Sequence, residues 1–247
     1  MKPNAASPRV LHADNDLVVI DKPAGLLAVP GRDQAPSAID LLRAMPPFSL
    51  DEPLRIVHRL DREASGVLVY ARTLEAQRHL VAQFVSRQVE KVYYALVRGY
   101  VERDGEVDLP LLLNRRRGRV EPAPQHGKPA LTRYTVLQRL PGHTWLECRP
   151  VTGRMHQIRA HLLAIGHPLA VDPLYGGSRA VMLSHYKPGY KLNRSGQERP
   201  LVDRLTLHAA RIAFTHPQDG RKVAFEAPLP KDLRATLRQL SRLLPTP

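Results

Sequence analysis

One short stretch of the chain, HRLDREASG at 58–66, places a single carboxylate, Asp61, among His58, Arg59 and Arg62. An ionised carboxylate can attack as a nucleophile or take up a proton, and nearby positive charge favours its ionised form. Taken alone, however, an aspartate before small residues is most often a turn or helix-cap residue. A partner elsewhere in the chain is needed to decide between these interpretations.

A second group of polar residues lies where the apolar spacing predicts a helix over residues 154–166. Arg154, Gln157 and His161 have the spacing i, i+3, i+7 and would share one stripe of this helix, beside its apolar stripe. The stripe offers cationic and neutral donors to a carboxylate such as Asp61. Considered alone, Arg154 is better explained as a surface charge at a helix end.

Several familiar reaction types lack their sequence motifs. Neither G-x-x-x-x-G-K-[ST] nor a G-x-G-x-x-G after a strand occurs, and Ser65 lacks the flanking glycines of a nucleophile elbow. HRLD differs from the kinase H-R-D by its leucine, and no D-F-G accompanies it. His156 and His161 would point roughly 140° apart on one helix, so they do not form a zinc pair. The sequence therefore predicts no cofactor and no metal.

Composition favours a globular protein with a polyanionic partner. The chain has 247 residues, 43% of them hydrophobic, and 37 Lys and Arg against 23 Asp and Glu give a net charge of +14. Such an excess suits phosphate binding through counterion release, although a generally basic surface is about equally plausible. The single cysteine, Cys148, is typical of a reducing cytosol. No signal peptide and no run of ~18 apolar residues is present, so a cytoplasmic protein without membrane contact is expected.

The elements that would position these groups alternate irregularly along the chain. Strands are predicted at 17–20, 66–71 and 92–97 and in a hairpin over 131–149 that turns at Pro141-Gly142, and helices at 74–87, 154–166 and 231–244. Two basic stretches, 114–129 and 176–203, are typical of loops. The pattern predicts an α+β fold with a mixed, largely antiparallel central sheet flanked by helices and loops.

Six segments resemble, in the same order, the motifs of pseudouridine synthases of the RluA type. They are LVVIDKPAGLLAVPG (17–31), IVHRLDREASGVLV (56–69), EKVYYALVRG (90–99), GKPALTRY (127–134), PVTGRMHQIRAHLLAIGHPLAVDPLYGG (150–177) and LTLHA (205–209). The resemblance runs from about Val10 to Pro228. It implies the catalytic fold of that family, with a central cleft, over 10–230, between a flexible arm at 1–9 and an amphipathic helix and tail at 231–247.

The chain departs from the family pattern at a few places. Ala64 stands where threonine is usual. Ala170-Val171 precedes Asp172, where the family more often has small residues with glycine. The segment 178–203 is longer than in the shortest members. The S4 domain of many relatives would need some tens of residues before Leu17. The catalytic domain and its charge are therefore expected to bind RNA without an S4 domain.

The resemblance implies an isomerase that cuts the glycosidic bond of uridine at N1 and remakes it at C5. Asp61 is then the essential catalytic residue, attacking the ribose or the base, or removing a sugar proton; the sequence does not choose between these routes. Tyr93 is expected to pack on the uracil and to serve as a general base. Arg154 is expected to hold Asp61 ionised in a buried ion pair, whose disruption would cost ~3–5 kcal/mol.

Other residues are assigned to the RNA. Flipping a uridine out of its stack costs a few kcal/mol, and Arg59 is suited to fill the vacated stack; His58 is interpreted as structural. The arginines of 114–129 are either a phosphate-contacting loop or a mobile solvated one, and Arg159 and His161 have packing as their alternative role. The RNA-contacting set is thus Arg59, Arg62, Arg115, Arg116, Arg117, Arg159 and His161, with Arg119 beside them.

Two other functions remain open. One is a catalytically silent RNA-binding protein that keeps the synthase fold, and the other is a glycosidase that releases uracil. The target, in stem-loops of ribosomal RNA, transfer RNA or both, is not readable from the sequence. No obligate protein partner is implied, and a monomer is expected.

Overall fold

The computed structural model describes residues 7–31, 35–51, 53–192 and 196–244. The chain forms two compact units, unit 1 with residues 1–92 and 208–228, and unit 2 with residues 93–207 and 229–247. The chain passes from unit 1 to unit 2 within one strand, β5, and returns within another, β11. Most of the predicted arm at 1–9 and the last three residues of the predicted tail lie outside the described residues.

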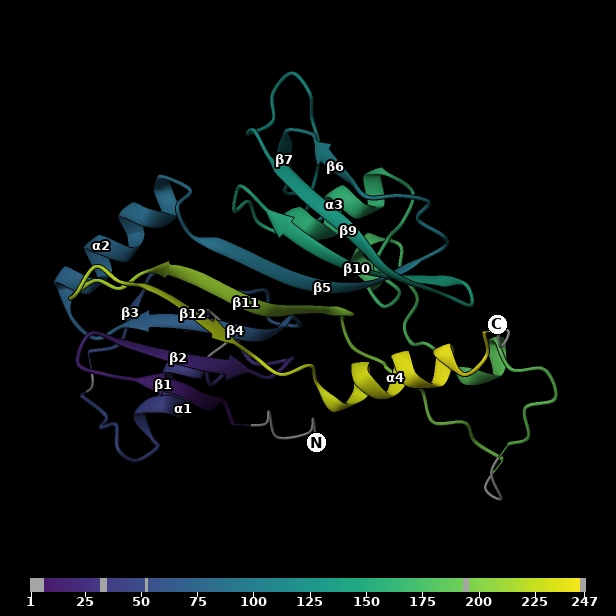
Figure 1. Ribbon diagram of the computed structural model, residues 1–247, viewed down its shortest axis with the longest axis horizontal. Helices are drawn as coiled ribbons and strands as arrows, with labels where there is room; N and C mark the ends of the chain where they lie inside the picture. The colour runs from purple at the N-terminus through teal and green to yellow at the C-terminus, as the bar shows by residue number, and fades with distance from the viewer. Residues whose placement is uncertain (1–6, 32–34, 52, 193–195, 245–247) are drawn as a thin grey trace. The chain divides into compact units, whose positions relative to one another are not determined.

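Unit 1 is built on strands in the order β1-β2-β4-β11, with β3 paired to β4 and β12 paired to β11 (Figure 1). β4 and β11 run parallel, whereas the other pairs just named are antiparallel. β4 is buried along its whole length, which explains its continuous apolar sequence. The bounds are β1 (Arg9–Ala13), β2 (Leu17–Lys22), β3 (Arg55–Ile56), β4 (Ser65–Ala71), β11 (Leu207–Thr215) and β12 (Lys222–Glu226).

Two helices complete unit 1, α1 (Ala38–Arg43) and α2 (Leu74–Val85). Ser37 and Asp40 form a capping box at the start of α1, and the Thr73 hydroxyl accepts the Ala76 N–H at the start of α2. The Gln83 amide joins α2 to the end of β11, because it donates to the Thr215 carbonyl at 2.7 Å and accepts the Thr215 N–H at 2.8 Å.

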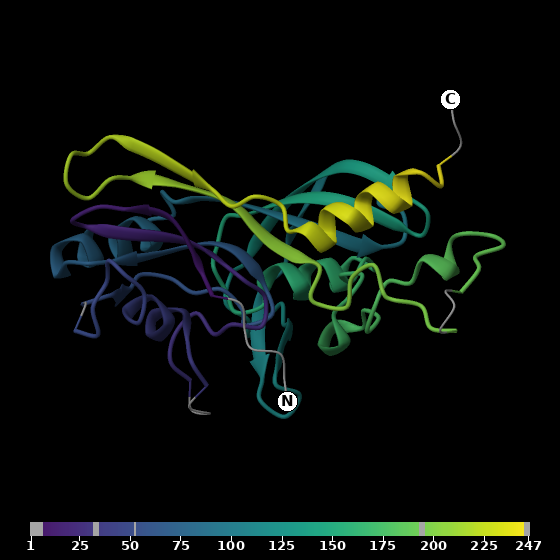
Figure 2. The same cartoon turned by 90° about the horizontal axis from the view of Figure 1, so that it is seen from below.

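Unit 2 has an antiparallel run of strands in the order β5-β10-β9-β6, with bounds β5 (Glu90–Arg98), β6 (Gly105–Asp108), β9 (Leu131–Leu140) and β10 (His143–Pro150). The predicted hairpin at 131–149 is confirmed, since β9 and β10 turn through Pro141 and Gly142, whose φ is +68°. A separate hairpin of β7 (Leu111–Asn114) and β8 (Arg119–Pro122) projects from the body of unit 2 (Figures 1 and 2).

The helices of unit 2 are α3 (Gln157–Ala164) and α4 (Lys231–Ser241), with 3₁₀ turns at Pro173–Tyr175 and Leu183–His185. α4 (yellow in Figure 2) turns its leucines inward, and Leu233 and Leu240 join a core cluster with Leu96 and Trp145. The Arg204 guanidinium binds the Asp232 carboxylate of α4 through two hydrogen bonds of 2.6 and 2.8 Å. The predicted amphipathic helix at 231–244 therefore has its apolar face in the core of unit 2.

The α+β fold class with a mixed, largely antiparallel sheet is confirmed. The predicted loop at 114–129 is wrong in part, because β8 occupies 119–122, where Val120 is buried and its N–H bonds the hydroxyl of Tyr175 at 2.9 Å. The domain bounds at 10–230 and 231–247 stay a prediction. No helix in the described ranges has the length and apolar character to span a membrane.

His143 gives unit 2 a stability that depends on pH. Burial, with a smaller contribution from Arg98, lowers the pKa of His143 to about 4 from its ordinary 6.5. Between these values the unfolded chain binds a proton that the folded chain does not, so the free energy of unfolding decreases as the pH falls. We expect His143→Gln to remove ~1 kcal/mol per pH unit of this decrease.

Urea unfolding between about pH 7 and about pH 4.5, followed by the fluorescence of Trp145, measures this effect. Trp145 is the single tryptophan of the chain and lies in the core of unit 2. Equal pH dependence in the variant and the wild-type protein would contradict the assignment.

Candidate active site

Asp61 lies in unit 1, in the loop between β3 and β4. Its neighbours Leu60 and Ala64 are buried, and Asp61 itself is half-buried. The carbonyl oxygen of Asp61 accepts the N–H of Ala64 at 3.1 Å, which closes a tight turn. The loop is therefore anchored by apolar side chains at both ends while its carboxylate stays partly accessible. Arg59 and Arg62, both assigned to RNA, are exposed on the same loop.

The segment that follows β2 holds this loop from the other side. The fully buried Lys22 donates from Nζ to three carbonyl oxygens, those of Pro23 at 2.9 Å, Leu26 at 2.8 Å and Arg62 at 3.0 Å. Gly25 makes two more hydrogen bonds to Arg62. Its N–H donates to the Arg62 carbonyl at 2.9 Å, and its carbonyl accepts from Arg62 Nε at 3.1 Å. Sequence reasoning missed Lys22, although the KPAG motif was its signal. A buried ammonium with carbonyl partners fixes the backbone beside Asp61.

His58 fixes the entrance to the loop. Its Nε2 accepts the N–H of Val69 at 3.0 Å, and its ring stacks on Phe84 with 4.8 Å between centroids. Burial, followed by the charge of Lys91, lowers the pKa of His58 to about 3. The imidazole is therefore neutral at physiological pH, as the accepted hydrogen bond requires. These contacts agree with the structural role expected for His58.

Tyr93 lies in unit 2, on β5, where it is paired with Cys148 of β10 and is half-buried. Two residues earlier, burial lowers the pKa of Lys91 to about 8. Arg154 is also in unit 2, whereas Asp61 is in unit 1. The approach of Tyr93 and Arg154 to Asp61 stays a prediction.

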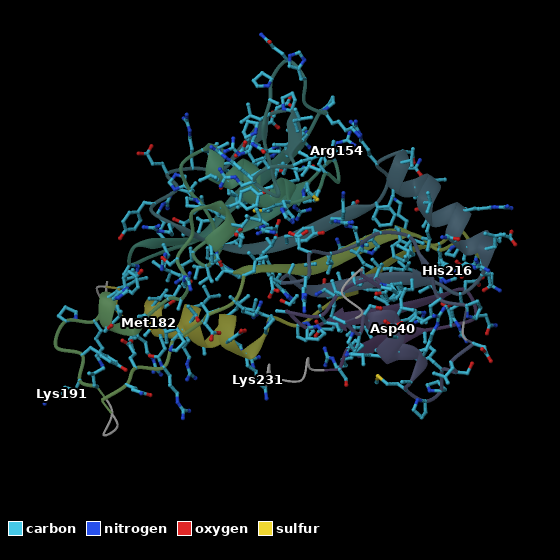
Figure 3. All side chains as sticks on the ribbon, turned by 180° about the vertical axis from the view of Figure 1, so that it is seen from behind. Asp40, Arg154, Met182, Lys191, His216 and Lys231 are labelled. Atoms are coloured by element: carbon cyan, nitrogen blue, oxygen red, sulfur yellow. The ribbon has the colours of Figure 1, made fainter. Side chains whose placement is uncertain are left out.

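Arg154 does not lie on the helix where the spacing placed it. α3 begins at Gln157, after His156 in the left-handed conformation with φ of +50°. The side-chain oxygen of Gln157 accepts the Arg154 N–H at 3.0 Å and the Thr152 hydroxyl at 2.7 Å, and so fixes the turn before the helix. Arg154, which is labelled in Figure 3, is exposed and not buried as expected, and its Nε donates to the carbonyl of Pro129 at 3.1 Å.

Arg159 and His161, assigned to RNA with packing as the alternative, are both buried. Arg159 binds Asp172 through Nε at 2.7 Å and Nη2 at 2.9 Å, and its guanidinium lies 4.8 Å from the centroid of Tyr175. His161 contacts the hydroxyl of Thr132 at 2.9 Å and the carbonyl of Leu109 at 3.0 Å, and burial lowers the pKa of His161. These contacts favour the packing role, and RNA contact by the two residues stays a prediction.

The arginines of the β7–β8 hairpin divide into two kinds. Glu121 accepts hydrogen bonds from Asn114, Arg117 and Arg119, and these bonds lower the pKa of Glu121 to about 2. Arg115 and Arg116 are exposed at the turn of the hairpin. The carboxylate therefore binds Arg119 at the start of β8 and Arg117 in the turn, whereas Arg115 and Arg116 lie at the projecting end of the hairpin (Figure 2).

The described residues bring no three His, Cys, Asp or Glu side chains together in a group that would hold a metal ion. The side chains that can take part in chemistry are instead Asp61, in a loop of unit 1, and Tyr93 and Arg154, on a strand and in a turn of unit 2. The loop, the strand and the turn are each held by hydrogen bonds within their own unit. A carboxylate can act as a nucleophile or take up a proton, and a phenol can transfer a proton.

Comparison with known proteins gives the family. The model of the RNA pseudouridylate synthase family matches residues 16–164. The chain is 41% identical over 240 residues to the ribosomal large subunit pseudouridine synthase D of Nitrosomonas europaea, covering 95% of this chain and 66% of the relative. It is 39% identical over 222 residues to the dual-specificity RNA pseudouridine synthase RluA of Pasteurella multocida, covering 89% and 92%. The chain belongs to the RNA pseudouridylate synthase family.

The fold agrees with this membership. The solved structure of human RNA pseudouridylate synthase domain containing 1 matches with a TM-score of 0.70 at 26% identity, covering 100% of both chains. The chain spans 66% of the length of the Nitrosomonas europaea relative and 59% of that of the synthase D of Neisseria meningitidis.

Proposed function

We propose that the protein is an RNA pseudouridine synthase that isomerises specific uridines in structured RNA. The observation that carries the proposal is the Asp61 loop, in which a half-buried carboxylate is held by buried neighbours, by Lys22 and by His58. The relatives support it, since their names assign them to ribosomal RNA or to dual-specificity RNA modification. Ribosomal RNA, transfer RNA or both are therefore the proposed substrates.

In the proposed reaction the bond between N1 of uracil and C1′ of ribose breaks, and a bond between C5 and C1′ forms. The C5 proton leaves to solvent, and N1 gains a proton, so atoms and electrons balance without a cofactor. Asp61 acts on the ribose or the base, and Tyr93 packs on the uracil and takes the C5 proton. Arg154 keeps the carboxylate ionised and directed.

Binding is proposed to use positive charge and base flipping. Arg59, exposed on the catalytic loop, replaces the flipped uridine in its stack, for which a planar guanidinium is suited. Arg115 and Arg116, exposed at the turn of the β7–β8 hairpin, contact phosphates, and the net charge of +14 adds a salt-dependent attraction. We infer that the protein acts in the cytoplasm as a monomer without an obligate protein partner. Light scattering would measure the oligomeric state.

The test uses RNA transcripts of large-subunit ribosomal RNA and of transfer RNA that carry tritium at C5 of uridine. Isomerisation releases the tritium to water because C5 exchanges its hydrogen for the glycosidic bond. We expect stoichiometric release at one or a few positions, with pseudouridine in the digested RNA. Free uracil would indicate a glycosidase, and binding without release from either RNA would favour the silent RNA-binding protein.

A further inference from the structure

A buried hydrogen bond joins the first residue of β4 to β11. The hydroxyl of Ser65 lies 2.9 Å from Nδ1 of His208, and the two residues are 3% and 0% exposed. Nε2 of the same ring lies 3.2 Å from the carbonyl oxygen of Ala227. Because a carbonyl only accepts, Nε2 carries the proton, and in a neutral ring Nδ1 is then the acceptor for the Ser65 hydroxyl.

The backbone around this bond leaves little room for adjustment. Ser65 and Gly66 of β4 are paired in parallel with His208 and Ala209 of β11. Gly66 has a φ of +118°, and a Cβ atom there would lie 2.1 Å from the carbonyl oxygen of Ala209. The strand that leaves the Asp61 loop is therefore pressed against β11 at its first two residues.

Only three residues separate this contact from the carboxylate. Ala64, directly before Ser65, donates its N–H to the carbonyl of Asp61 at 3.1 Å, so the turn and the strand share one rigid segment. The middle of the loop is held by Lys22 and Gly25 through the Arg62 carbonyl, and its entrance by His58. The exit is the end that His208 holds.

We propose that His208 is a positioning residue for the proposed reaction, acting through Ser65 to fix the exit of the Asp61 loop and so the placement of the carboxylate. The inference rests on the proposed function. A displacement of ~1 Å in a catalytic group costs ~10²-fold in rate, so a lost Ser65 contact changes turnover more than RNA binding.

Two substitutions of His208 separate positioning from general packing. In His208→Asn the side-chain oxygen occupies the place of Nδ1 and keeps an acceptor for Ser65, but the donor to Ala227 is lost. In His208→Gln the amide nitrogen occupies the place of Nε2 and keeps the donor to Ala227, but the acceptor for Ser65 is lost. Each variant loses one buried hydrogen bond, so similar losses of stability are expected.

We expect His208→Gln and Ser65→Ala each to lower kcat by ~10–100-fold with KM within about twofold of wild type, and His208→Asn to keep kcat within about threefold. The double variant Ser65→Ala/His208→Gln should be no slower than either single variant, because both remove the same contact. Hydrogen exchange of a peptide covering 59–66 should accelerate in His208→Gln and Ser65→Ala but not in His208→Asn.

Equal kcat and equal exchange in the two His208 variants, or a wild-type kcat in Ser65→Ala, would overturn the inference. If His208→Gln does not fold, Ser65→Ala, which removes only one oxygen atom, tests the inference by itself. Failure of the proposed function has a different signature, since the wild-type protein itself would then release no tritium, while the exchange measurement still reports whether His208 holds the loop.

Discussion

Asp61→Asn is expected to abolish tritium release from 5-tritiated RNA, with a loss of at least about 10³-fold in kcat. The asparagine has the same shape but neither ionises nor acts as a nucleophile. The turn should survive, because the bond that closes it uses the Asp61 carbonyl and not the side chain. RNA affinity, measured by fluorescence anisotropy, is expected to stay within about threefold of wild type, since phosphate contacts dominate binding.

Glu63→Gln is the matched control for this prediction. Glu63 lies two residues further along the same loop, is exposed, and approaches Arg62 at 3.9 Å. Its replacement removes one negative charge from the same segment and is expected to leave kcat within about twofold, because exposed pairs contribute little. An Asp61→Asn variant that keeps more than about a tenth of the wild-type rate would refute the catalytic role. If RNA affinity and kcat fell together in this variant, Asp61 would be assigned to RNA binding and not to chemistry.

Local sequence patterns were sufficient for one uniformly buried strand, one helix and one hairpin. The apolar run at 66–71 became β4, which is buried throughout, and LEAQRHLVAQFV became α2 because Leu80 and Ala76 face the core at helical spacing. The hairpin at 131–149 followed from its Pro-Gly turn. In each case the sequence pattern that predicts the element spans about ten residues, so no contact with a distant residue was needed for the prediction.

The elements that were placed wrongly depend on contacts between distant residues. β8 lies in a basic, loop-like sequence, but Val120 is bonded to Tyr175, 55 positions away. α3 starts three residues later than the apolar spacing indicated, because the Gln157 side-chain oxygen accepts the Arg154 N–H in place of a regular first turn. The Gln157 amide nitrogen is held by the Leu131 carbonyl and the Thr132 hydroxyl, 26 and 25 positions away. Neither contact leaves a local pattern in the sequence.

The candidate site shows the same division. The motif around Asp61 identified the loop but not its supports, since Lys22 is of a residue type that is mostly exposed and His208 of a type with intermediate burial. They are buried because main-chain carbonyls and one hydroxyl satisfy them, and those partners come from the fold. The roles of Arg59, Tyr93 and Arg154 came from the family resemblance and stay predictions about chemistry.

Asp172→Asn is expected to lower the free energy of unfolding of unit 2 by ~3–5 kcal/mol. Asp172 is 1% exposed and binds Arg159, itself 7% exposed, through two hydrogen bonds of 2.7 and 2.9 Å. The asparagine leaves a buried guanidinium without its anion, and that uncompensated charge is the main cost. Urea unfolding followed by Trp145 fluorescence measures the loss, since Trp145 and Asp172 belong to the same unit.

Two further variants show whether the missing charge is the cause. Glu106→Gln breaks the exposed pair between Glu106 and Arg133, at 3.3 Å in the same unit, and is expected to cost less than ~1 kcal/mol. Arg159→Met/Asp172→Leu removes both buried charges together and should lose less stability than Asp172→Asn alone. A loss below ~1 kcal/mol for Asp172→Asn would show that water reaches the guanidinium, and an Arg159 open to water would again be a candidate for RNA contact.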